Sequence, residues 1–159
     1  MIGAALWMLA AASPAPGLLD RLVERLRASG TIPPAALRRM TGAPLRMAPG
    51  TAAYRVRTAE ARDGEARLGI ELRTPRPGGG ATAGALTIVR VRTGCIPRGQ
   101  VIARYAPLAV SAVPHGHALA EETSWSRRER HGLLSFGFAE ARPDCLSTVT
   151  FDGTRRPVP

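Results

Sequence analysis

Two neighbouring segments that alternate apolar and polar side chains constrain the fold of this chain most. Over residues 54–58, tyrosine, valine and threonine alternate with arginine, and over residues 68–72, leucine and isoleucine alternate with glycine and glutamate. A period of two is typical of strands that bury one face. Asp63 and Gly64 lie between the segments and indicate a turn. The sequence therefore predicts an antiparallel hairpin.

The length of the turn decides which residues of this hairpin share a face. A two-residue turn at residues 63–64 sets Val56 opposite Glu71, which puts a charge on the apolar face. A three-residue loop over residues 62–64 sets Val56 opposite Ile70 instead. Because the register of a hairpin follows its apolar face, we predict the three-residue loop.

The remaining pattern predicts two helices and three further strands. Leucines spaced four residues apart indicate a helix over residues 17–29, and a proline start indicates a second over residues 34–40. A turn and short helix are expected over residues 95–105, and residues 106–124 read as irregular. Strands are expected at residues 85–92, 133–139 and 146–151, with Phe136 facing Val149 and Leu134 facing Phe151.

Together these elements predict a single α+β domain over residues 17–152. In it an N-terminal helix packs on an antiparallel sheet of about five strands. Residues 153–159 are expected to form a disordered tail. About 140 residues suffice to bury one core without help.

The first sixteen residues, MIGAALWMLAAASPAP, have the pattern of an export signal. Residues 2–12 are apolar and uncharged, and small residues and prolines follow them. The stretch is too short to span a bilayer, which needs about 20 residues. We therefore expect residues 1–16 to be a signal peptide and the protein to be periplasmic or secreted. A buried N-terminal segment of the mature fold is the alternative, since only the amine of Met1 supplies positive charge.

The chain has two cysteines, Cys95 and Cys145. In an oxidising compartment an even number of cysteines favours a disulfide. Neither cysteine lies in a CxxC motif, which argues against a redox or zinc site. We predict one disulfide between them, with two buried free thiols as the alternative.

The formal net charge is +10, and all 22 basic residues are arginine. These arginines are spread along the chain, and seven aromatic residues leave few side chains to stack on bases. Nucleic acid is therefore not the expected partner. A cationic surface still favours an anionic partner, either an envelope protein or an anionic surface.

Two local groups of residues could carry chemistry. His115, His117 and Glu121 could hold a metal ion, because imidazoles two residues apart can converge and a carboxylate can complete the site. Their loop is rich in proline and glycine, which favours a solvated loop instead. No GxSxG motif supports a serine nucleophile.

The second group is the segment WSRRER. Trp125, Arg127, Arg128 and Arg130 could bind an anionic partner by stacking and bidentate pairing. The competing interpretation is an exposed loop with one tryptophan beneath it.

These patterns favour a small exported protein that is not an enzyme and needs no cofactor. We expect an accessory or binding protein of the cell envelope. The alternative is a periplasmic metal-dependent or hydrolytic enzyme that uses the loop of His115 and His117.

Overall fold

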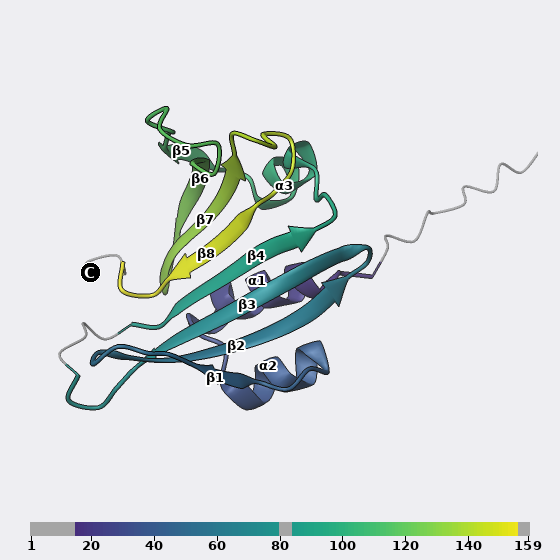
Figure 1. Cartoon of the computed structure of the whole chain (residues 1–159). Coiled ribbons are helices and arrows are strands. Elements are labelled where there is room, and N and C mark those ends of the chain that lie inside the picture. The colour runs from purple at the N-terminus through teal and green to yellow at the C-terminus, as the bar shows by residue number, and fades with distance from the viewer. Residues whose placement is uncertain (1–14, 80–83, 156–159) are drawn as a thin grey trace, which may run out of the picture.

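The computed structural model describes residues 15–79 and 84–155, which form one antiparallel sheet and three helices (Figure 1). The sheet has eight strands in the order β1-β2-β3-β4-β8-β7-β6-β5. The strands are β1 (Arg46–Ala48), β2 (Tyr54–Asp63), β3 (Ala66–Pro75), β4 (Leu86–Thr93), β5 (Ala109–Ala112), β6 (Glu122–Glu129), β7 (Gly132–Ala139) and β8 (Thr148–Asp152). The helices are α1 (Leu18–Ser29), α2 (Pro34–Thr41) and α3 (Arg98–Tyr105).

The predicted α+β fold, an N-terminal helix on a sheet of about five strands, is wrong. The sheet has eight strands, and more of the described residues lie in strands than in the three short helices. The strands that the sequence pattern missed are β1, β5 and β6. The first two have three and four residues, too few to show alternation. In β6 the ion-paired Arg127 lies on the same face as Trp125, which breaks the alternation of apolar and polar residues.

One apolar row crosses seven of the strands and places the core. Its members are paired in register from β2 to β5: Ala59, Ile70, Val89, Val149, Phe136, Trp125 and Val110. The first five are buried, Trp125 is partly buried, and Val110 at the edge is 49% exposed. The core therefore lies on one face of the sheet.

All three helices pack on that face. Helix α1 contributes five buried residues at helical spacing, Leu18, Leu19, Leu22, Val23 and Leu26. Helix α2 contributes Leu37, and α3 contributes Val101 and Tyr105, whose ring stacks on Phe136 with centroids 4.7 Å apart. Figure 1 shows α1 and α2 behind the long strands of the sheet. No helix of the described residues lies over the other face.

The predicted helices near residues 17–29 and 34–40 are confirmed as α1 and α2. Helix α1 ends at Gly30, which has a φ of 73° and donates its N–H to the carbonyl of Leu26 at 2.7 Å. Such a left-handed position strongly favours glycine. The end of α1 was therefore readable from the sequence.

The structure confirms the predicted register of one hairpin and contradicts that of the other. In the C-terminal hairpin, Phe136 faces Val149 and Leu134 faces Phe151, as predicted. In the first hairpin the predicted three-residue loop is wrong, because Asp63 pairs with Ala66 and leaves a two-residue turn.

This register change moves the apolar face of β2. Ala59 now lies opposite Ile70, and Val56 lies on the other face, opposite Arg73. Gly64 takes the first turn position with a φ of 57°, which suits a two-residue hairpin. Helices α1 and α2 pack against β2, where alanines face them. Small alanines give little apolar signal, so the larger Val56 was assigned to the wrong face.

The predicted disulfide is confirmed: Cys95 and Cys145 are bonded, with Cα atoms 5.1 Å apart. Next to it, Pro97 and Cys145 form an isolated antiparallel bridge. The bond thus ties the segment before α3 to the segment before β8. No helix in the described part of the chain is long and apolar enough to cross a membrane.

Both predicted termini lie partly outside the described residues. Of the predicted signal peptide, only residues 15 and 16 are described. Of the predicted tail, residues 153–155 are described, and Gly153 donates its N–H to the carbonyl of Ala85 at 2.9 Å. The extent of the signal peptide and of the tail stays a prediction.

Replacing both cysteines by serine should destabilise the protein by about 4 kcal/mol, because the bond closes a loop of about 50 residues in the unfolded chain. Urea unfolding of the oxidised protein and of the double variant measures the difference. The control is the reduced wild-type protein, whose free energy of unfolding should equal that of the double variant. A double variant as stable as the oxidised protein would contradict the prediction.

Candidate functional site

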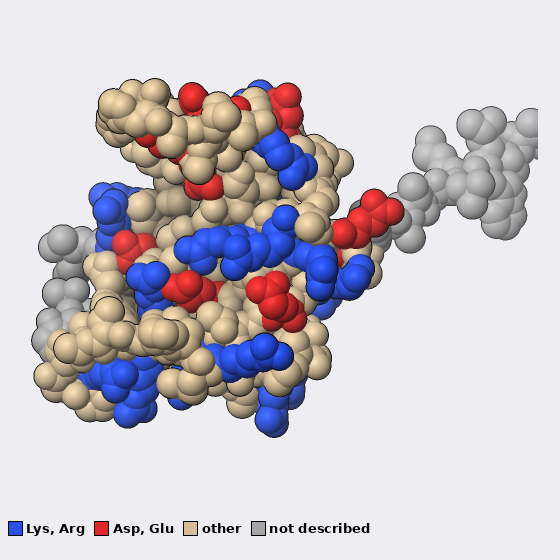
Figure 2. All heavy atoms as spheres, viewed as in Figure 1, with Lys and Arg blue, Asp and Glu red and all other residues tan. Residues whose placement is uncertain are grey.

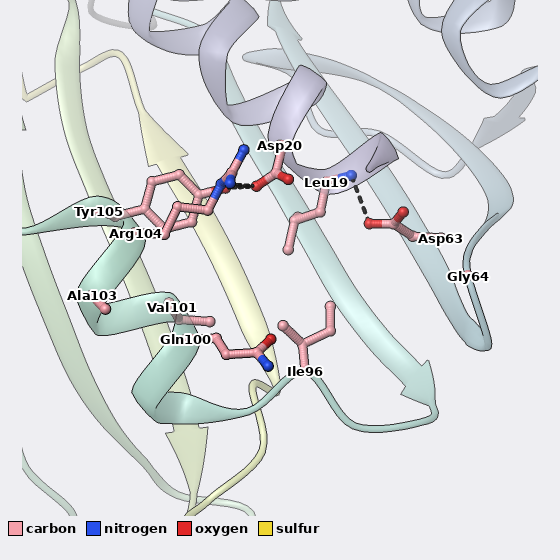
Figure 3. Close-up of a pocket in the computed structure, with 10 residues that line it drawn as sticks. All are labelled: Leu19, Asp20, Asp63, Gly64, Ile96, Gln100, Val101, Ala103, Arg104 and Tyr105. Carbon is pink, nitrogen blue, oxygen red and sulfur yellow. Dashed lines mark hydrogen bonds and ion pairs between the residues drawn. The ribbon is translucent and has the colours of Figure 1, made fainter. Parts of the chain in front are cut away.

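A cleft of about 740 Å³ lies between the N-terminal end of α1, the β2–β3 turn and α3 (Figure 3). Apolar side chains of Leu19, Ile96 and Val101 point into it. Its polar rim is built by Asp20, Asp63, Gln100, Arg104 and Tyr105.

Asp63, from the β2–β3 turn, holds the start of α1. Its two carboxylate oxygens accept hydrogen bonds from the backbone N–H groups of Leu18 at 2.8 Å and Leu19 at 2.9 Å. A carboxylate here satisfies free helix donors and complements the helix dipole. A Cβ at the preceding Gly17 would lie 2.5 Å from a carboxylate oxygen of Asp63. Glycine at this position therefore lets Asp63 approach the helix.

Asp20 joins α1 to α3 on the other side of the cleft. Its carboxylate accepts a hydrogen bond from the Tyr105 hydroxyl at 2.5 Å and pairs with Arg104 at 2.5 Å. It also accepts the backbone N–H of Gly17 at 3.3 Å. Burial raises the pKa of Tyr105, and the neighbouring Asp20 raises it further. The hydroxyl therefore stays protonated as a donor at neutral pH.

These contacts connect α1 to the β2–β3 hairpin and to α3, so the cleft residues have a structural role. Both carboxylates of the cleft are engaged in contacts of α1, and among the described residues no serine, cysteine or histidine lines it. The arrangement has room for a small apolar group but offers no nucleophile with a base beside it.

The predicted metal ligands lie in the loop between β5 and β6. Glu121 accepts hydrogen bonds from the backbone N–H groups of His115 at 2.5 Å and of Gly116 and His117 at 3.2 Å. The two imidazole rings lie parallel, with centroids 6.5 Å apart. In residues 15–79 and 84–155, no three potential metal ligands gather around one point. Glu121 shapes the loop, and a metal site here stays a prediction.

The residues predicted to bind an anion do not share one surface. Trp125 packs against the core, and Arg127 lies on the same face of β6. Arg127 pairs with Glu129 at 2.8 Å and donates to the carbonyl of Tyr105 at 3.2 Å. Arg128 and Arg130 are exposed, and the alternation of β6 turns Arg128 to the other face. Half of the predicted group thus lies on the helix side of the sheet, where Trp125 packs against the core and Arg127 is ion-paired.

A stronger cationic surface lies on the sheet face opposite the helices, which we call the open face. On strands β1–β4, the register brings six arginines and two glutamates to this face, which gives six positive charges against two negative ones, or +4. Figure 2 shows a row of basic residues across the middle of the molecule, with acidic residues below it and further basic residues nearer the lower edge. The six arginines of the open face are Arg46, Arg62, Arg67, Arg73, Arg90 and Arg92, with Glu60 and Glu71 between them.

Part of this charge is paired. Glu71 forms ion pairs with Arg73 at 2.5 Å and with Arg90 at 3.3 Å. Burial acts to raise the pKa of Glu71, but the two arginines outweigh it, so the pKa lies below its ordinary value. The carboxylate therefore stays ionised and occupies these two arginines.

Three other arginines are free to meet a partner: Arg62, Arg67 and Arg92, which we call the arginine cluster. Arg62 and Arg67 lie directly opposite each other on β2 and β3. A shift of register in β4 inserts Arg92 as an extra residue. Its guanidinium lies over Gly69, where the carboxylate of Glu60 also lies. All three are exposed, and no ion pair involves them within the described residues.

The other half of the open face carries hydroxyl groups. Ser126 bonds to the hydroxyls of Ser111 at 2.6 Å and Ser135 at 2.7 Å. Thr148 donates to Glu122 at 2.7 Å and pairs in register with Arg90. Figure 2 shows the surface hollowed between the arginine row and the lobe above it. The arginine row therefore borders a polar hollow.

Sequence reasoning missed the arginine cluster because it treated the arginines as scattered. The segment Val89–Arg92, in which valine and arginine alternate, is the signal that could have indicated a strand with a cationic face. The pairing of Arg62 with Arg67 needed the correct hairpin register, and the predicted register was wrong. The pairing of the strands therefore brings the three arginines together.

Replacing Asp63 by alanine should destabilise the protein by about 1–2 kcal/mol, because two N–H groups of α1 lose their acceptor. The control is Glu65→Ala in the same turn, for which no hydrogen bond appears and a change within about 0.5 kcal/mol is expected. Urea unfolding of both variants measures the difference. Equal stabilities of the two variants would contradict the role of Asp63.

Comparison with known protein families, curated proteins and solved structures found no match to this chain. The open face brings together three exposed arginines that form no ion pair within the described residues, in the arginine cluster.

Proposed function

We propose that this chain is a small exported binding protein of the cell envelope, which is not an enzyme and holds an anionic partner on its open face. The observation that carries this proposal is the arginine cluster. Three exposed arginines meet on a face that the described helices leave uncovered.

The energetics of the cluster support an anionic partner. Like charges directly opposite each other on a sheet are destabilising, and Arg62 faces Arg67. A carboxylate or phosphate between them relieves this repulsion. The planar guanidinium also matches both groups with two parallel hydrogen bonds. Carboxylate or phosphate is therefore the chemistry that the cluster fits best.

The proposed location in the periplasm or outside the cell rests on two observations. Residues 1–16 have the composition of a signal peptide. The disulfide between Cys95 and Cys145 favours an oxidising compartment, where such bonds persist. The predicted alternative, an enzyme using His115 and His117, gains no support from the loop, where Glu121 holds the backbone.

Export predicts that the protein recovered from its native host lacks the signal peptide and contains the disulfide. Intact-mass spectrometry of a periplasmic or secreted fraction measures both, because the bond lowers the mass by two hydrogens. A protein that begins at Met1 and is found in the cytoplasm would contradict export and leave the binding proposal to be judged separately.

The binding proposal is tested with two probes that carry the two acidic groups. Fluorescein-labelled hexaglutamate supplies carboxylates, and phosphatidylglycerol vesicles supply phosphates. We expect one probe to bind more tightly, which identifies the source, and its binding to weaken as salt rises. Exchanging Arg62, Arg67 and Arg92 together for glutamine should weaken that binding by about tenfold or more, or about 1.4 kcal/mol.

The matched control exchanges three arginines of the helices, Arg25, Arg38 and Arg39, for glutamine. These are exposed, and the net charge falls by the same three units. We expect the control to bind like the wild-type protein. Equal losses in both triple variants would mean that net charge alone attracts the probes, and this result would overturn the proposal. Absence of binding to either probe at low salt would overturn it as well.

A further inference from the structure

Strand β5 is an edge of the sheet that carries no charged side chain. It bonds to β6 on one side, and its four residues are all exposed. Charged residues commonly block the edge strands of monomeric proteins, and β5 has none. Its short length and the irregular register between Val110 and Ala112 limit any pairing to a few residues. The other edge, β1, carries Arg46.

Exposed apolar side chains are frequent in β5 and in the loop that follows it. In the described residues four large hydrophobic side chains are exposed: Met47, Val110, Val113 and Leu119. Three of them belong to β5 or to the loop that follows it, and they are 49%, 58% and 71% exposed. Figure 2 shows the lobe that carries β5 as largely uncharged. Of these side chains, Val110 lies on the edge strand itself, where it is open to contact with another protein.

The charge distribution indicates which protein fits. Residues 105–126 contain no arginine, and Glu121 and Glu122 are their only charged residues apart from histidine. The whole chain carries a net charge of +10, so two copies repel each other over most of their surface. The end that carries β5 is where two copies meet with the least repulsion.

We propose that β5 pairs with β5 of a second copy of this chain, antiparallel and across a two-fold axis. The contact joins two eight-stranded sheets into one and brings the exposed Val110 of each copy against the other copy. Pro107 and Pro114 flank the strand and confine the pairing to a short segment, because proline has no N–H to donate. The edges left in the dimer are the two β1 strands with Arg46, which keeps the assembly closed.

This inference does not rest on the proposed function, and salt separates the two. Screening weakens the repulsion between two cationic copies, so dimerisation should strengthen as salt rises. Binding of an anionic probe to the arginine cluster weakens under the same change. The sign of the salt dependence therefore tells the two interactions apart.

The test is sedimentation equilibrium of the disulfide-bonded protein from micromolar to millimolar concentration. We expect a monomer–dimer equilibrium that high salt shifts toward the dimer. Val110→Lys should raise the dissociation constant by about tenfold or more, because it places a charge on the paired edge. Met47→Lys on the other edge is the matched control, since it adds the same charge at a side chain that is 63% exposed. It should dimerise like the wild-type protein.

Hydrogen exchange of the wild-type protein keeps the test independent of how the variants fold. The backbone N–H groups of residues 109–112 should become more protected as the protein concentration rises, while those of β1 should not change. A wild-type protein that stays monomeric at every concentration and salt overturns the proposal. So does a dimer that Met47→Lys weakens as much as Val110→Lys, or one that leaves the β5 amides unprotected.

Discussion

The burial of one sheet face under three helices is the constraint on which the rest of this structure depends. An apolar row from Ala59 to Trp125 runs in register across the strands from β2 to β6, and the helices pack on this face. Because side chains alternate along a strand, the residues between these positions must face the other way. In β4 the same alternation buries Val89 and turns Arg90 outward. The alternation that buries the apolar residues on one face thus places the arginines on the opposite, open face.

The turn between β2 and β3 couples the two faces. On the helix side, Asp63 holds the first N–H groups of α1. On the open face, Arg62 and Arg67 flank the same turn. The turn fixes the backbones of these two residues relative to each other, while their exposed side chains keep their rotamer freedom. The stability of α1 and the geometry of the arginine cluster therefore depend on the same few residues.

Local signals predicted the parts of the fold that local contacts determine. The spacing of leucines and Gly30 predicted α1, and large apolar residues predicted that Phe136 faces Val149. The short strands at the two edges take their stability from their neighbours, so the sequence pattern missed them. The arginine cluster needed the correct hairpin register and the extra residue in β4, both of which tertiary packing decides. Of the candidate site, only its positive charge could be predicted.

The central claim is that the open face, and not the charge of the chain as a whole, binds an anionic partner. The most direct measurement is an NMR titration of the ¹⁵N-labelled protein with hexaglutamate, compared with added sodium glutamate at equal ionic strength. The account predicts that shifts concentrate at Arg62, Arg67, Arg92 and the strand residues beside them. Shifts centred on the three helices or on residues 125–130, or shifts equal to those in sodium glutamate, would contradict it.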